Sequence, residues 1–175
     1  MKKIAIILCF LLSGSINAQN NAGKPAKAAT NEWDKLDKVF IAFVDALVKN
    51  DKTAFKAISY PAVDCIDCVG KPEFNKEGYF VTSDVFFLNI ANNFVNSPVY
   101  KAMAKRGYTF SISEIKDFKP KVLPKDYPKD LKLYEVWVPT YLKGELSKNH
   151  PGTSHAFQFI KIKGEFKFYG LTSIP

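Results

Sequence analysis

The 175-residue sequence has little of several residue types on which common functions depend. Only one of its 25 basic residues is an arginine, the residue that supplies planar, bidentate contacts to bases and phosphates. The lysines are scattered, and their densest run, at 116–132, also carries three aspartates and three prolines, which is typical of a solvated loop. The formal net charge of +8 therefore does not predict a nucleic-acid-binding protein.

Familiar catalytic and membrane motifs are also lacking. The nine glycines do not cluster, and the sequence has no phosphate-binding glycine loop, serine nucleophile motif or metalloprotease helix pattern. Outside the first 18 residues, no stretch approaches the roughly 20 consecutive apolar residues that a transmembrane helix needs. No cofactor, no metal and no membrane span is therefore expected.

The first 18 residues have the order of an export signal. Two lysines at 2–3 precede an apolar run at 4–12, and Ile-Asn-Ala at 16–18 is a small-residue cleavage site. Residues 1–18 are therefore predicted to be a signal peptide, and the mature protein is expected in the periplasm or the medium. This compartment is an expectation from the sequence alone.

The remainder of the chain predicts one domain behind a tether. Residues 19–30 are small and polar without a hydrophobic period, which is typical of a flexible segment. Residues 31–175 carry the apolar periodicity, and a chain of this length buries a sizeable core in one unit. We therefore expect a single domain over 31–175.

Helical patterns fill the first part of this domain. Apolar residues recur at steps of three and four from Trp33 to Leu47, which predicts an amphipathic helix capped by Asn31. Asp51 can cap a short second helix, which Pro61 would end. A loop is expected over 61–81 with a short extended piece at 79–81, and further helices run from Thr82 or Ser83 through Phe94 and from Ser97-Pro98 to Arg106-Gly107.

Beyond residue 107 the apolar period changes to two, which predicts strands at 108–118, 131–143, 154–163 and 165–173. Lys163-Gly164 has the pattern of a two-residue hairpin loop. The resulting register pairs Ile162 with Glu165, Phe159 with Phe168, Lys161 with Phe166 and His155 with Thr172. One face of the hairpin, with His155 at its outer end, then collects four phenylalanines that should meet the helices, and the opposite face shows Ile160, Ile162 and Tyr169.

Two stretches carry a family resemblance. LVKNDKTAFKAISYP at 47–61 and HAFQFIKIKGEFKFYGLTSIP at 155–175 resemble the nuclear transport factor 2-like superfamily, also called cystatin-like or SnoaL-like. The resemblance implies an α+β cone in which N-terminal helices pack on a curved antiparallel sheet of about four strands. It also implies an apolar, aromatic-lined cavity that dimerisation often closes. It implies no particular reaction, since members include isomerases, dehydratases and protein-binding modules.

After removal of the signal, Cys65 and Cys68 are the remaining cysteines. In an oxidising compartment this spacing favours a structural disulfide. A redox role is an alternative, although Asp64 and Asp67 beside the sulfurs would raise the thiol pKa. A zinc site with His150 and His155 is a further alternative, although the two pairs are far apart in sequence.

These observations give three functional hypotheses. The leading one is an exported, non-catalytic domain that binds a small apolar ligand or a partner protein through an aromatic-lined cavity. Its expected pocket residues are Trp137, Phe157, Phe159, Phe166 and Phe168. The second is a cavity acid/base enzyme in which His155 acts with Glu135 or Tyr141. The third is an interaction module that forms a homodimer through the outer sheet face.

Overall fold

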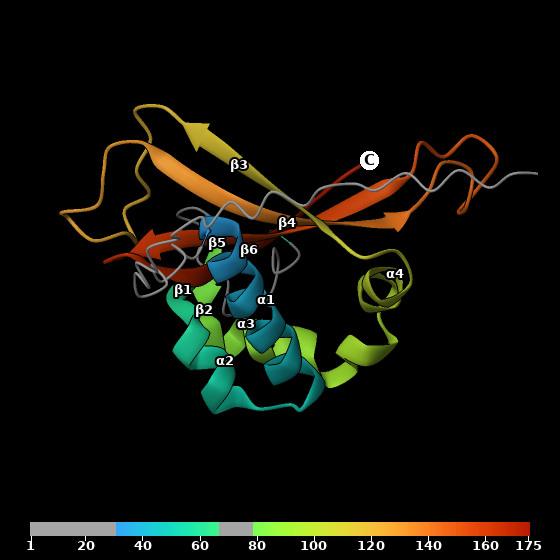
Figure 1. Ribbon diagram of the computed structural model, residues 1–175, viewed down its shortest axis with the longest axis horizontal. Helices are drawn as coiled ribbons and strands as arrows, with labels where there is room; N and C mark the ends of the chain where they lie inside the picture. Colours follow the sequence, from blue (N-terminus) through green and yellow to red (C-terminus); the bar gives the residue numbers. More distant parts are fainter. Residues whose placement is uncertain (1–30, 67–78) are drawn as a thin grey trace, which may run out of the picture.

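The computed structural model describes residues 31–66 and 79–175, which form helices followed by a six-stranded sheet (Figure 1). The helices are α1 (Glu32–Val48), α2 (Lys52–Ile58), α3 (Ser83–Ile90), the 3-10 helix η2 (Ala91–Asn96) and α4 (Pro98–Arg106). The strands are β1 (Ser59–Cys65), β2 (Phe80–Thr82), β3 (Thr109–Ile115), β4 (Leu131–Tyr141), β5 (Thr153–Ile162) and β6 (Glu165–Ile174). The predicted α+β class is confirmed, with six strands in the described part of the chain instead of about four.

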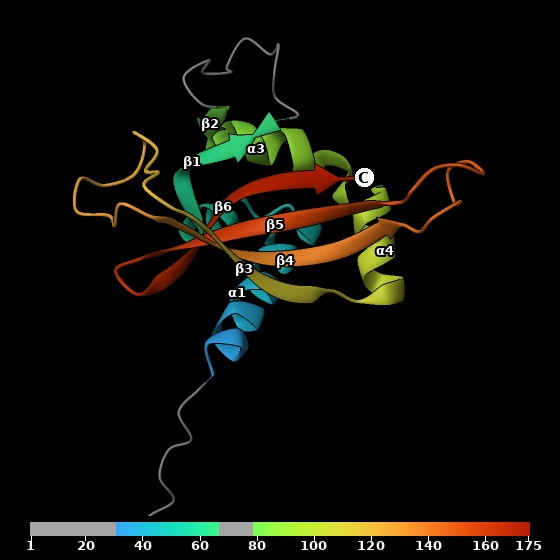
Figure 2. The same cartoon turned by 90° about the horizontal axis from the view of Figure 1, so that it is seen from above.

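The helices cover one face of the sheet. Its strand order is β2-β1-β6-β5-β4-β3, and every pairing is antiparallel except that of β1 with β6. Figure 1 shows α1, α2 and α3 beneath the sheet, and Figure 2 shows the curved strands from above. Within the described residues, no helix is both long enough and apolar enough to cross a membrane.

The predicted helix starts are confirmed. Asn31, Asp51, Thr82 and Ser97 each accept a hydrogen bond from a backbone N–H two or three residues further on, which satisfies a donor that the helix leaves free. Helix α4 ends at Arg106 and is capped by Gly107, whose φ of 75° suits a residue without a Cβ. The helix predicted to run through Phe94 is wrong in one respect, because α3 ends at Ile90 and a 3-10 helix follows.

Strand β1 corrects the loop expected from Pro61 onward. It pairs with β6 on one side and with β2 on the other. Pro61 fits because the pairing with β6 is interrupted between Ser59 and Asp64, so the ladder does not require the N–H that proline lacks. The short extended piece predicted at 79–81 is confirmed by β2.

The β5–β6 hairpin has the predicted turn, and it has the predicted register close to that turn. Lys163 and Gly164 have φ values of 50° and 85°, as the two-residue turn that matches strand twist requires. Ile162 faces Glu165 and Phe159 faces Phe168. Beyond Phe159, however, the register shifts at a bulge, so His155 lies opposite Ser173 and not Thr172.

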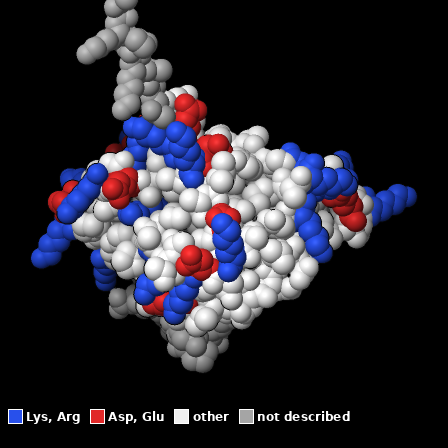
Figure 3. Space-filling model, turned by 60° about the horizontal axis from the view of Figure 1, so that its bottom comes forward, with Lys and Arg blue, Asp and Glu red and all other residues white. Residues whose placement is uncertain are grey.

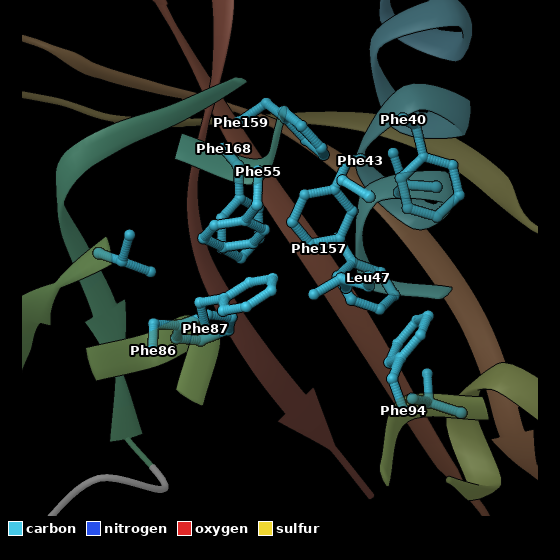
Figure 4. Packing of buried hydrophobic residues seen from close by; sticks show 14 of the residues in the cluster. Phe40, Phe43, Leu47, Phe55, Phe86, Phe87, Phe94, Phe157, Phe159 and Phe168 are labelled. Atoms are coloured by element: carbon cyan, nitrogen blue, oxygen red, sulfur yellow. The ribbon is translucent and has the colours of Figure 1, made fainter. Parts of the chain in front are cut away.

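The main core lies between the helices and the phenylalanine face of the sheet, as predicted (Figure 4). Phe40 and Phe43 of α1 contact Phe157 and Phe159 of β5, and Phe43 lies 4.4 Å from Phe168 between ring centroids. All five side chains are at most 1% exposed. Burial of each ring stabilises the fold by about 1.5–3 kcal/mol, so these contacts hold α1 on the sheet.

A second core lies on the opposite face. Ile160 and Tyr169 are buried there against Leu123, Leu131 and Leu133. Leu123 belongs to the lysine-rich segment 116–130, whose lysines stay exposed while Val122, Leu123 and Tyr127 cover the sheet. Ile160 and Tyr169 are therefore not available for the predicted dimer contact, because this chain covers them itself, whereas the homodimer as such stays a prediction.

Candidate functional site

The four phenylalanines predicted to line a cavity are packed core. Phe157, Phe159 and Phe168 have no exposed surface, and Phe166 is 6% exposed. Figure 4 shows the rings of α1, α2 and the sheet directed toward one another, and these rings occupy the space in which the cavity was expected. Interiors packed in this way leave no room for a ligand.

Trp137 lies on the other face of the sheet. In β4, Val136 and Val138 point to the helices, so the alternating Glu135 and Trp137 point away from them. The indole Nε1 of Trp137 donates to Ser111 Oγ at 3.0 Å. The expected grouping of Trp137 with the phenylalanines is therefore wrong, because strand alternation separates them.

A polar row crosses this outer face and was not expected from the sequence. Asp64, Gly170, Gln158, Glu135 and Ser111 are successive cross-strand neighbours from β1 to β3. These residues are far apart in the chain, so only the sheet pairing brings them together. The row meets the second core at Tyr169, the neighbour of Gly170.

Glu135 is the centre of that row. Its Oε2 accepts hydrogen bonds from Ser111 Oγ at 3.1 Å and Ser113 Oγ at 2.7 Å, and its Oε1 accepts from Gln158 Nε2 at 3.0 Å. Glu135 is 5% exposed. A buried carboxylate with three donors is satisfied, so the geometry gives Glu135 a structural role.

His155 does not meet Glu135. It lies opposite Val138 and alternates with Phe157, which places it on the helix-facing side of the sheet. Its Nδ1 lies 2.7 Å from Thr140 Oγ1, at the rim of the core. The predicted acid/base pair of His155 and Glu135 is therefore wrong, since the sheet separates the two side chains.

Tyr141 lines a polar hollow of about 450 Å³ between α4 and the end of β4. Arg106 crosses this hollow, donating to the carbonyl oxygens of Pro139 and Thr140 at 2.9 Å each and pairing with Glu145. These contacts fasten the β4–β5 connection to α4. The Arg106 guanidinium in this hollow is thus already occupied by these partners.

The cysteine motif is only partly visible. Cys65 ends β1 and is 6% exposed, whereas Cys68 lies outside the described residues, so the disulfide and its redox and metal alternatives stay predictions. Across 31–66 and 79–175, no group of three or more His, Cys, Asp and Glu side chains could hold a metal ion. Burial raises the pKa of the neighbouring Asp64 to about 6.

An apolar groove of about 370 Å³ lies between α1 and α4, outside the predicted site. The lining residues are Phe40, Ile41, Val44, Asp45, Val48, Tyr100, Met103, Ala104 and Tyr108. Ile41 and Val48 are 54% and 39% exposed, although both are large and apolar. The sequence contains one indication of this groove. Ile41 and Val48 lie seven residues apart, which is two helical turns, and beside the core stripe of α1.

Tyr108 closes one part of the groove. Its hydroxyl donates to Asp37 Oδ1 at 2.6 Å, and its ring packs edge-on against Phe40 at 4.8 Å between centroids. Burial, with the hydrogen bond to Asp37 and its negative charge, raises the pKa of Tyr108 to about 12. The phenol therefore keeps its proton at neutral pH and stays fixed by α1.

Comparison with known proteins leaves the function open. No family model matches the sequence, and no curated protein matches it. Among solved structures, the chain is similar at 11% identity to a hexachlorocyclohexane dehydrochlorinase (LinA) type 2, covering 80% of this chain and 82% of that one with a TM-score of 0.33. An NTF-2 like protein of unknown function from Shewanella oneidensis has 14% identity over 81% of this chain and 97% of that one, with a TM-score of 0.34.

A third structure is a putative calcium/calmodulin dependent protein kinase II association domain from Xanthomonas campestris. It has 12% identity over 85% of this chain and 90% of that chain, with a TM-score of 0.36. These distant likenesses carry no inference about activity. The architecture described above, with helices on one face of a curved sheet, is the α+β arrangement that the resemblance in the sequence implies.

Proposed function

We propose that this protein is an exported binding domain that holds a small apolar ligand in the groove between α1 and α4. The observation that carries the proposal is the groove itself, whose volume of about 370 Å³ falls within the size range of small-molecule sites. Export rests on the order of charged, apolar and small residues in 1–18.

The exposed apolar side chains of the groove support binding. Ile41, Val44 and Val48 project from α1, and Met103 and Ala104 from α4. Figure 3 shows interspersed acidic and basic side chains around a broad uncharged area on the helical side of the molecule. A ligand would remove this apolar surface from water, at about 25 cal/mol for each Å² buried.

The test uses the neutral fluorophore N-phenyl-1-naphthylamine, whose emission rises in an apolar site. We expect saturable fluorescence enhancement with the wild-type protein. Ile41→Lys should abolish it, because a charge would enter the groove. Ala104→Trp should also reduce it by filling the volume, without adding charge.

The matched control is Leu88→Lys on α3. Leu88 is 56% exposed, against 54% for Ile41, and does not line the groove, so both variants exchange an equally exposed helical side chain. Far-UV circular dichroism confirms that each variant is folded. Equal enhancement from Ile41→Lys and the wild type would refute the proposed site.

Export has its own measurement. The mass of the protein recovered from the exported fraction of the expression host should correspond to a chain that begins at Gln19. A full-length mass, or retention of the protein with the cytoplasmic fraction, would refute this part of the proposal.

A further inference from the structure

We infer that the ligand of the α1–α4 groove is a cationic amphiphile, an organic ammonium group attached to an apolar tail. The inference rests on the proposed function and names the chemical class of its ligand. It follows from how charges and aromatic rings are distributed around the groove.

Helix α4 lies between the polar hollow and the apolar groove, and it presents its basic side chains to the hollow. Its basic residues Lys101, Lys105 and Arg106 line the polar hollow toward β4, whereas Tyr100 and Met103 line the groove toward α1. Among the residues that the structure describes, no lysine or arginine lines the groove. An anionic head group would therefore find no cation in the groove itself.

The charged side chain that does line the groove is acidic. Asp45 of α1 lies on its wall, and Asp37, one further acidic residue of α1, holds the Tyr108 hydroxyl. Lys49 pairs with Asp45 at 2.7 Å, but the two side chains are 66% and 53% exposed. Exposed pairs of this kind are weak, so an ammonium group that is better shielded from water can replace Lys49.

Aromatic rings complete the site for a cation. Tyr100 and Tyr108 line the groove and are partly exposed, and Phe40 is buried beneath them, 4.8 Å from Tyr108 between ring centroids. The faces of such rings attract ammonium groups, most strongly when water is excluded. The thioether of Met103 and the aliphatic side chains of α1 then accommodate the tail.

The experiment compares three probes with the same ten-carbon chain, namely decyltrimethylammonium, decanol and decanoate. Each displaces N-phenyl-1-naphthylamine from the full mature protein below its micelle concentration. We expect the ammonium probe to bind about tenfold more tightly than decanoate, with decanol between them. High salt should reduce the difference in affinity between the ammonium probe and decanoate.

The contribution of the carboxylate is tested with Asp45→Asn. This variant should reduce the preference for the ammonium probe over decanoate by about two thirds, and it should change the affinity for decanol less than the affinity for the ammonium probe. The matched control is Asp34→Asn, which makes the same change in the first turn of α1, away from the groove. Equal effects of the two substitutions would overturn the role of Asp45.

The outcomes separate this inference from the proposed function. If decanoate or decanol binds as tightly as decyltrimethylammonium, the inferred ligand class is wrong while the groove remains a binding site. If none of the three probes displaces the fluorophore and the fluorophore itself does not bind, the proposed function fails and the inference fails with it.

Discussion

Replacing Glu135 tests whether the polar row on the outer sheet face is structural. The Glu135 carboxylate accepts three hydrogen bonds, from Ser111, Ser113 and Gln158, and is 5% exposed. Glu135→Ala removes this acceptor and leaves the Gln158 amide without its partner. The change should therefore lower the free energy of unfolding.

The size of the loss follows from opposing effects. A hydrogen bond to a charged group contributes about 1.5–3 kcal/mol, but taking a carboxylate out of water costs several kcal/mol. Ser111 and Ser113 are half-buried, so water can partly replace their lost acceptor. We expect Glu135→Ala to cost about 2–4 kcal/mol and Glu135→Gln, which keeps the shape and one acceptor, about 1 kcal/mol.

Urea denaturation followed by far-UV circular dichroism measures these losses. Glu114→Ala is the control, because this neighbouring strand residue is exposed and its pairing with Lys116 should contribute less than about 0.5 kcal/mol. A double-mutant cycle of Glu135→Ala with Gln158→Ala should give a coupling of about 0.5–3 kcal/mol. If Glu135→Ala costs no more than Glu114→Ala, the structural role of the row is refuted.

Three further predictions concern the main core and the same row. Phe168→Ala should cost about 3–5 kcal/mol in urea denaturation, because its ring has no exposed surface, and a loss below about 1 kcal/mol would contradict the packing. Gly170→Ala should cost about 1–3 kcal/mol, since the added Cβ would lie 2.9 Å from Asp64 Cβ and 3.1 Å from its carbonyl oxygen; a neutral effect would contradict this close approach. Burial raises the pKa of Asp64 from 3.8 to about 6 in the folded state, so between these pH values the folded chain binds more protons than the unfolded chain. The contribution of this group to stability is therefore present below about pH 4 and is lost as the pH rises to about 6. Asp64→Asn should abolish that part of the pH dependence of the urea midpoint, and an unchanged pH profile would show that Asp64 is solvated.

Local interactions made much of the fold predictable. Asn31, Asp51 and Ser97 cap helices by bonding to backbone N–H groups two or three residues away, so the sequence near each cap was sufficient. The Lys163-Gly164 turn likewise determined the register of β5 and β6 near the loop. The predicted register is wrong only beyond the bulge, where packing rather than the turn decides which residues pair.

Long-range packing decided the candidate site. The polar row joins residues of five strands, and the groove joins α1 to α4, which are separated by about fifty residues of sequence. The sequence patterns gave each strand its alternation but not what would cover its second face. For that reason the sequence does not show that Trp137 lies apart from the phenylalanines, or Glu135 apart from His155.

The sequence by itself determined the helix starts, the hairpin turn and the phenylalanine face that meets α1, because neighbouring residues and side-chain period specify them. Only the tertiary structure decided that α1 fills the expected aromatic cavity, that segment 116–130 covers the outer face, and that an open groove remains beside α4. Whether apolar surface becomes a core or a binding site depends on which distant element packs against it, and that choice follows from shape and volume in three dimensions.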